Sequence, residues 1–177
     1  LEKLGYFYQE ALQAAPDDEH RAYTAGHYAS LLTDLGQPQA AVDLLQPAIE
    51  QALSEEAKTE LSRSLTSVWM GQLSPPYDPE QLTQLKNLLW EVLQKYEQQD
   101  RPLETGLLLL DAAQVATIDE SFSEALGYIS RAIALFEGES VVELVANAQH
   151  RRGMLLYTWA QNDNPQFYRP AAESFQE

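Results

Sequence analysis

The stretch 122-FSEALGYISRAIALF-136 decides the fold, because its apolar and small side chains recur at the spacing of one α-helix face. Intervals of 3, 4 and 3 residues separate Phe122, Ala125, Ile129 and Ala132. Side chains at such intervals lie on one side of a helix, and the two alanines let a second helix approach closely. The stretch therefore predicts a helix packed tightly against a neighbour.

The same pattern occurs twice more in the first third of the chain. It appears in 38-PQAAVDLLQPAI-49 and, in a shorter form, in 8-YQEALQAAP-16. Turn signals such as 35-LGQP-38 separate the patterned segments, since glycine ends one helix and proline starts the next. We predict an all-α chain, an α-solenoid of antiparallel helix hairpins. The approximate hairpins are 1–16 (a half repeat), 19–53, 55–98, 102–137 and 140–177.

The longest predicted connection is 71-GQLSPPYDPEQ-81, which is rich in proline. Asp78 is the predicted N-cap of the following helix, with Pro79 at its first position and Gln81 at its third, as in a capping box. A connection of about ten residues exceeds the usual length between bundle helices, so it is a candidate contact loop or simply a long turn.

Acidic side chains dominate the charge of the chain. Its 177 residues include 11 Lys and Arg against 27 Asp and Glu, which gives a formal net charge of −16. The length and the 45% hydrophobic content are typical of one globular domain, here 1–177. This charge repels phosphate backbones and anionic lipids, so we expect neither nucleic acid nor membrane partners, and basic peptides are favoured. The acids also have a simpler interpretation as a solvated outer face.

The sequence contains no signal for secretion, membrane insertion or catalysis. It has no cysteine, and no apolar run approaches the about 20 residues that span a bilayer. We expect a cytoplasmic protein, or a segment excised from a longer one, because the chain begins at Leu1. There is no Gly-rich phosphate loop, no H-E-x-x-H and no G-x-S-x-G. We therefore expect no enzymatic activity and no cofactor.

One acidic and histidine-containing segment has the composition of a metal site. It contains Asp17, Asp18, His20 and His27. The two histidines are two helical turns apart, about 10 Å along a helix, which is too far for both to hold one ion. We expect no bound metal.

The hairpins resemble the tetratricopeptide repeat (TPR) family over essentially the whole chain. In that family, small residues stand where helices cross, and a large residue separates two small ones in the second helix. The fourth hairpin matches at Ala113, Phe122, Ala125, Ile129 and Ala132. The second matches at Ala29, Gly36, Ala41, Leu45 and Ala48, and the fifth at Gly153, Ala171 and Phe175. The third departs from the pattern at Leu65, Leu85 and Val92.

The spacing of the repeats departs from the family's usual period of about 34 residues. Every step between the equivalent positions is longer than that period, and these positions are Ala11, Ala48, Val92 and Ala132. The chain resembles a long-helix TPR variant with about 37 to 46 residues per repeat.

The resemblance implies a right-handed superhelix whose concave wall is lined by the first helix of each hairpin. A mixture of aromatic and small polar side chains on that wall suits a partner's amphipathic peptide or helix. The implied groove residues are Tyr23, Ser30 and Thr33; Ser62, Thr66 and Trp69; Leu110, Gln114 and Thr117; and Asn147, His150, Met154 and Tyr157.

Other features leave alternatives open. The basic residues of the family's carboxylate clamp are missing, since Ser30, Ser62 and Thr66 occupy groove positions. The pair Arg151 and Arg152 either binds an acidic ligand or forms a salt bridge to Glu143 or Glu139. Trp69 and Trp90 are interpreted as packing between helices, and Trp159 as either packing or surface.

We interpret the chain as a non-catalytic interaction scaffold that binds a peptide or helix of a partner protein. One alternative is a homo-oligomer formed through exposed apolar stripes at the two ends. These stripes are Leu4, Tyr8 and Leu12, and Phe167, Ala171 and Phe175. The other alternative is a regulatory segment of a larger enzyme or transcription regulator.

Overall fold

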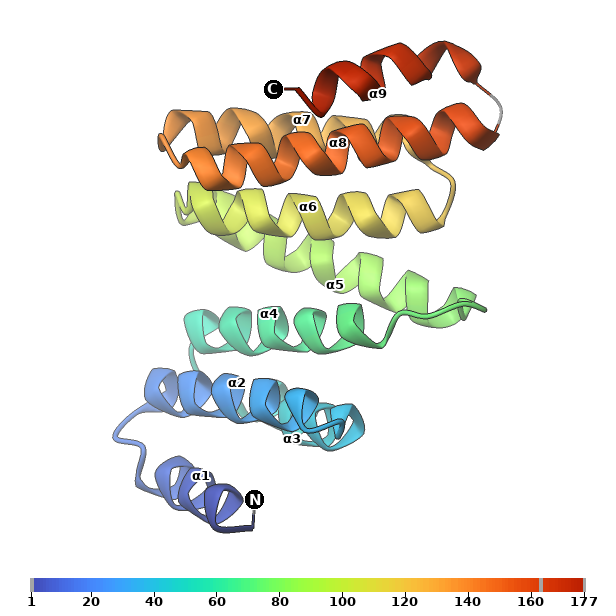
Figure 1. Ribbon diagram of the computed structural model, residues 1–177. Coiled ribbons are helices and arrows are strands. Elements are labelled where there is room, and N and C mark those ends of the chain that lie inside the picture. The colour runs from blue at the N-terminus through green and yellow to red at the C-terminus, as the bar shows by residue number, and fades with distance from the viewer. Residues whose placement is uncertain (1, 163, 177) are drawn as a thin grey trace. The chain divides into compact units, whose positions relative to one another are not determined.

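The computed structural model of the chain describes the backbone of residues 2–162 and 164–176, and the side chains from residue 5 within those ranges. Every regular element there is helical, and within each unit helices form antiparallel hairpins such as α2–α3 and α6–α7 (Figure 1). The fold is therefore an all-α solenoid, as predicted. The elements are α1 (Glu2–Ala14), α2 (Asp18–Asp34), α3 (Pro38–Gln51), α4 (Glu55–Gln72), α5 (Pro79–Gln98), α6 (Pro102–Ile118), α7 (Phe122–Gly138), α8 (Val142–Asn162), the 3₁₀ turn η1 (Pro165–Phe167) and α9 (Tyr168–Ser174).

The chain divides into two compact units, Leu1–Leu88 and Leu89–Glu177. The division falls inside α5, so the first half of that helix belongs to one unit and the second half to the other. A single domain over 1–177 stays a prediction.

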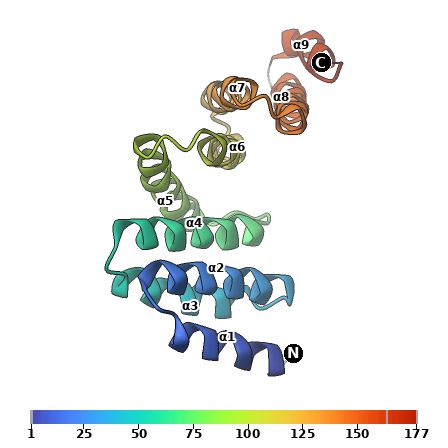
Figure 2. The same cartoon turned by 90° about the vertical axis from the view of Figure 1, so that its left-hand side faces the viewer.

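In the first unit, α2 packs against α1, α3 and α4, and α3 also packs against α4 (Figure 2). Small side chains bring the helices together, because α2 contributes the buried Ala22, Ala25 and Ala29. At Gly26 a side chain could not fit, since a Cβ there would lie 2.7 Å from Ser64 Oγ on α4. The core is completed by leucines and valines of α2, α3 and α4.

Asp18 connects two parts of the first unit that are distant in sequence. Its carboxylate, in the first turn of α2, accepts hydrogen bonds from the backbone N–H groups of Leu53 (2.6 Å) and Ser54 (3.0 Å) before α4. These two bonds hold the pKa of Asp18 below its ordinary value. Ser54 in turn caps α4 by accepting a hydrogen bond from the N–H of Ala57 at 3.0 Å.

In the second unit, α7 packs against α6 and α8, and α8 packs against η1 and α9. The stripe predicted within 122–136 faces this core, and all four of its side chains are buried. Gly106 lets the fully buried Phe136 ring lie against α6. Gly153 does the same on α8 for Phe175, since a Cβ would lie 2.5 Å from its Cε1.

Four helices end in the same way, with one residue in the left-handed conformation. In each case the next N–H bonds back to a carbonyl in the last turn, as from Ser121 to Ala116 at 2.8 Å. Only one of these four left-handed residues is a glycine, the one in the predicted turn 35-LGQP-38. The left-handed residues are Gly36, Asp100, Glu120 and Ser140.

The start of α5 agrees with the prediction, because Asp78 Oδ1 accepts a hydrogen bond from the N–H of Glu80 at 2.9 Å. The predicted exposed stripes at the chain ends are exposed only in part, because Phe175 is 48% exposed whereas other members pack on neighbouring helices. Tyr8 stacks on Tyr28 with ring centroids 4.9 Å apart, and Leu12 packs on the first core. Ala171 is buried, and the side chain of Leu4 lies outside the described residues. These packed residues cover the adjacent helix, whereas the ring of Phe175 both contacts α8 and remains open to solvent.

Candidate functional site

The second unit contains a pocket of about 250 Å³ between α6 and α8, which we call the α6–α8 pocket. Both helices are first helices of their hairpins, and one residue of α7 also contributes. The lining residues are Leu110, Ala113, Gln114 and Thr117 of α6, Ile129 of α7, and Arg151, Met154, Leu155 and Thr158 of α8. Four of the sequence-predicted groove residues, Leu110, Gln114, Thr117 and Met154, thus share one pocket.

The α6–α8 pocket is mainly apolar in character. Leu110, Ile129 and Leu155 are buried, whereas Met154 is 49% exposed. The hydroxyl of Thr117 donates to the carbonyl of Ala113 at 2.7 Å. Such a bond satisfies the hydroxyl within its own helix, so it offers little to a ligand.

Polar contacts to a ligand would come from Gln114 and Arg151, because the hydroxyl of Thr158 is also satisfied locally, by the carbonyl of Met154 at 3.0 Å. Gln114 is exposed. Arg151 lines the pocket and donates from Nε to Asn147 Oδ1 at 3.1 Å, which fixes its orientation along α8. The pocket can hold an apolar group with an amide and a guanidinium nearby.

Two other predicted groove residues of α8, His150 and Tyr157, lie beside α9. The ring of His150 is 5.5 Å from that of Phe175, and the ring of Tyr157 meets Tyr168 edge-on at 5.9 Å. Tyr157 nevertheless remains 43% exposed. Asn147 is exposed and joins the pocket only through Arg151.

The predicted groove residues of the first unit do not share one accessible surface. Ser62 and Thr66 of α4 are buried, so neither can meet a ligand in this conformation. Trp69 packs against the first core. The exposed ones are on α2, where Tyr23 has 69% of its surface free and Ser30 is also exposed. Thr33, half-buried, donates its hydroxyl to the carbonyl of Ala29 at 2.9 Å.

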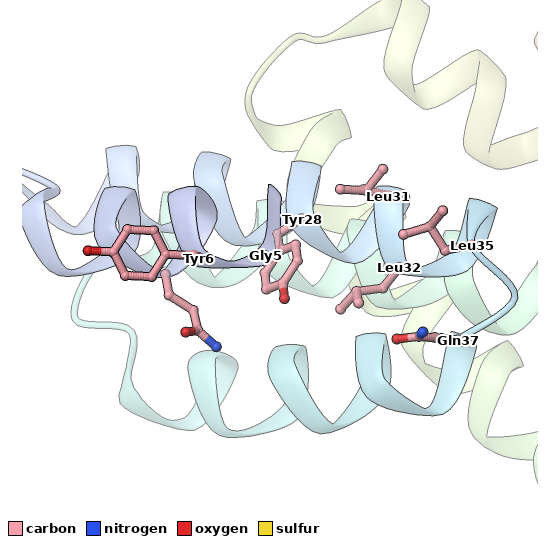
Figure 3. A pocket seen from close by; sticks show the side chains of 8 residues that line it. Gly5, Tyr6, Tyr28, Leu31, Leu32, Leu35 and Gln37 are labelled. Carbon is pink, nitrogen blue, oxygen red and sulfur yellow. The ribbon is translucent and has the colours of Figure 1, made fainter. Parts of the chain in front are cut away.

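The first unit instead contains a cavity that the sequence analysis missed, which we call the α1–α2 slot (Figure 3). Its volume is about 360 Å³. The lining residues are Gly5, Tyr6 and Gln9 of α1, Tyr28, Leu31 and Leu32 of α2, and Leu35 and Gln37 of the following turn. The only sequence signal was the cluster of leucines at the end of α2.

Three predictions about large side chains can be compared with the structure. Trp90 is 52% exposed, so its interpretation as packing is wrong. Trp159 stacks between Phe122 (5.8 Å) and Phe167 (4.2 Å), which makes it a packing residue. Trp69 is a packing residue as predicted.

The basic and metal-like groups are engaged within the fold. Arg152 Nε donates to Ser174 Oγ of α9 at 2.9 Å, a partner that the sequence analysis did not foresee. Asp17 bonds to the ring Nδ1 of His20 at 2.7 Å, while Asp18 is directed at the start of α4. Within residues 5–162 and 164–176, no three acidic or histidine side chains gather in a way that could hold a metal ion. No helix in the described part of the chain has the length and apolar character needed to span a bilayer.

The fold is shared with a solved structure. The chain is similar to the crystal structure of a Podosopora anserina protein described as a putative kinesin light chain with nearly identical TPR-like repeats. The TM-score is 0.71, the similarity covers 98% of this chain and 84% of that chain, and the sequence identity is 15%. At this identity the similarity shows the fold alone, a TPR-like helical repeat. No protein-family model and no curated protein matches the chain.

Proposed function

We propose that the chain is a non-catalytic scaffold for protein interaction, and that the α6–α8 pocket receives an apolar side chain of a partner peptide or helix. The observation that carries this proposal is the pocket itself, which opens between the first helices of two successive hairpins. In solenoids of helix pairs, this inner surface is the one that commonly binds other proteins.

The surroundings of the pocket support an apolar anchor. Leu107 precedes Leu110 by three positions, so it lies on the same side of α6, and it is 46% exposed. Met154 stands at the pocket mouth on α8, and an unbranched methionine adapts to ligands of different shape. Tyr157 adds a half-exposed aromatic one turn further along α8. A single large aliphatic or aromatic side chain, entering beside Met154, would bury the most apolar surface.

The acidity of the chain favours a partner segment that carries positive charge. The formal net charge of the 177-residue chain is −16, and this charge would repel an acidic ligand at long range. The proposal assumes a cytoplasmic setting, which the absence of cysteine from the sequence supports.

We also infer that the repeats belong to a long-helix TPR variant. The left-handed turn residues Asp100, Glu120 and Ser140 are evenly spaced along the chain, so α6 and α7 with their turns occupy segments of equal length. The segment from Asp100 to Ser140 contains both helices, and it is longer than the about 34 residues of the usual repeat.

Selection of peptides from a phage-displayed random library tests the proposed pocket without a known partner. The purified chain should enrich peptides that share one large apolar residue. These peptides should bind the Met154→Glu variant at least about tenfold more weakly, because a charge would replace an apolar contact. Val142→Glu is the matched control, since Val142 is 77% exposed on the same helix and does not line the pocket. Enriched peptides that bind all three proteins equally would place binding elsewhere and refute the proposed pocket.

Light scattering over a range of concentrations tests the alternative of self-assembly. The scaffold proposal expects a constant mass near the 19.9 kDa of one chain. A mass that rises with concentration would favour a homo-oligomer instead.

A further inference from the structure

The α1–α2 slot has an apolar floor, and none of the described residues that line it is charged. Leu32 is buried, Leu31 is half-buried, and Leu35 is 38% exposed at the slot's end. Tyr6 stands at the opposite end and is 58% exposed (Figure 3). The slot therefore leaves apolar surface open to solvent at both of its ends.

Glycine at position 5 lets α1 lie close to the ring of Tyr28. A Cβ at Gly5 would lie 3.0 Å from the hydroxyl oxygen of Tyr28, so a side chain there would force this ring to shift. Tyr8, one turn further along α1, stacks on the ring of Tyr28 with centroids 4.9 Å apart. A stacked pair of rings makes this wall of the slot rigid.

Amide groups provide the polar part of the lining. Gln9 and Gln37 belong to α1 and to the turn before α3, and both side chains are exposed. Each carries a donor and an acceptor, which together match the N–H and C=O groups of a polypeptide backbone. The slot can thus hold a peptide segment as well as an apolar side chain.

The charge around the slot is negative. Among the described side chains of α1, α2 and α3 there is one lysine or arginine, Arg21. It lies about 21 Å from Leu35 along the helix axis and pairs with Asp18 at 3.5 Å. The last turn of α2 contains Asp34 and no basic residue. Because the end of a helix also carries partial negative charge, a cation near Leu35 would be stabilised.

We propose that the α1–α2 slot binds a segment of a partner protein in which a large apolar side chain is flanked by lysine or arginine. The apolar side chain packs on Leu31, Leu32 and Leu35. The amides of Gln9 and Gln37 hold the backbone of the segment. The flanking basic residue lies near Asp34 at the end of α2. This binding site belongs to the first unit, so it does not depend on the α6–α8 pocket.

Fluorescence anisotropy with the full chain tests this proposal. The probe is a short fluorescein-labelled peptide of leucine and lysine in the pattern of an amphipathic helix. We expect saturable binding that weakens about tenfold in Tyr6→Ala, in Leu35→Gln and in Asp34→Lys. Control peptides replace every lysine by glutamate or every leucine by serine, and neither should bind measurably.

Matched variants separate the slot from the rest of the surface. Phe7 is 66% exposed beside Tyr6 but does not line the slot, so Phe7→Ala should leave the affinity within about twofold. Glu19→Lys is the charge control for Asp34→Lys, since Glu19 lies at the other end of α2. Met154→Glu should have no effect, which distinguishes this proposal from that for the α6–α8 pocket. Circular dichroism confirms that each variant is folded.

Amide chemical shifts of the labelled protein locate the bound probe directly. The proposal expects the largest changes at Gly5, Leu35 and Gly36. It is overturned if the leucine–lysine peptide does not bind, if the serine peptide binds equally well, or if Phe7→Ala weakens binding as much as Tyr6→Ala. Shift changes confined to α6 and α8 would also overturn it.

Discussion

Replacing Gly106 by alanine should destabilise the second unit, whereas the same replacement at Gly127 should stabilise it. Both glycines lie inside helices, where alanine is favoured over glycine by about 1 kcal/mol. A Cβ at Gly127 meets nothing within 4 Å, so this gain should be realised in full. Both sites therefore favour alanine over glycine as helix positions, and they differ only in the atoms that surround the new Cβ.

The cost at Gly106 comes from Phe136. A Cβ there would lie 2.7 Å from Cζ of this ring, inside the 3.4 Å at which ordinary contact begins, and closer still to Cε1. Phe136 has no exposed surface, so its ring can move only by displacing other core atoms. Overpacking of this kind costs about 1–3 kcal/mol, which leaves Gly106→Ala less stable by up to about 2 kcal/mol after the helical gain.

Gly153 provides an intermediate case. A Cβ there would lie 2.5 Å from Phe175, but that ring is 48% exposed and can rotate outward. We expect Gly153→Ala to change stability by less than about 1 kcal/mol. The order of stability should be Gly127→Ala, then Gly153→Ala, then Gly106→Ala.

Thermal unfolding followed by circular dichroism measures this order. A change of about 1 kcal/mol shifts Tm by roughly 4–8 °C in a unit of this size, so Gly106→Ala should lower Tm by up to roughly 16 °C. A second replacement, Phe136→Leu, should cost less in the Gly106→Ala background than in the natural sequence, because the ring and the methyl group compete for one space. A higher Tm for Gly106→Ala, or strict additivity of the two replacements, would refute the packing argument.

Two further predictions concern the helix ends. Asp18→Ala should lower the Tm of the chain at neutral pH, while Glu19→Ala should change it little. Because the folded-state pKa of Asp18 is lowered, the stability that Asp18 contributes is complete above about pH 4 and is lost as the pH falls further. The Tm difference between the natural sequence and Asp18→Ala should therefore shrink in acid. A Tm difference that stays constant with pH would contradict this account. Glycine at the left-handed positions should stabilise the chain by about 0.5–1 kcal/mol, more at Glu120 than at Asp100, because aspartate tolerates this conformation better. Urea unfolding measures the stability of Glu120→Gly and Asp100→Gly, with Gly36→Ala as the destabilised control. A loss of stability in Glu120→Gly would contradict the left-handed conformation of Glu120.

Part of the candidate site could be predicted from the register that the resemblance to the TPR family implies. The register brought Leu110, Gln114 and Thr117 to one face of α6 and Met154 to the corresponding face of α8, and these four line the α6–α8 pocket. The same register predicted a groove role for Thr66, which is fully buried. Periodicity identifies the residues of one helix face, but it does not state how closely the next helix covers that face.

The α1–α2 slot also shows that periodicity does not state how closely a neighbouring helix covers a helix face. Of the three leucines in the slot, Leu32 is buried and Leu31 is half-buried, yet Leu35 remains partly exposed. The slot arises because Gly5 lets α1 lie close to Tyr28 while α1 and the start of α3 leave the leucines uncovered. This arrangement depends on contacts between residues of different helices, beyond the reach of any local pattern.

The sequence by itself determined the class of the protein, the positions of its helices and the buried stripe of 122–136. These follow from interactions within a few neighbouring residues, namely the helical period, the caps and the turn residues. Only the tertiary structure decided which faces stay open, that Trp90 is exposed and Trp159 stacked, and that Arg152 bonds to Ser174. Exposure is set by how closely neighbouring helices approach, and that distance depends on pairs such as Gly106 with Phe136, whose partners lie on different helices.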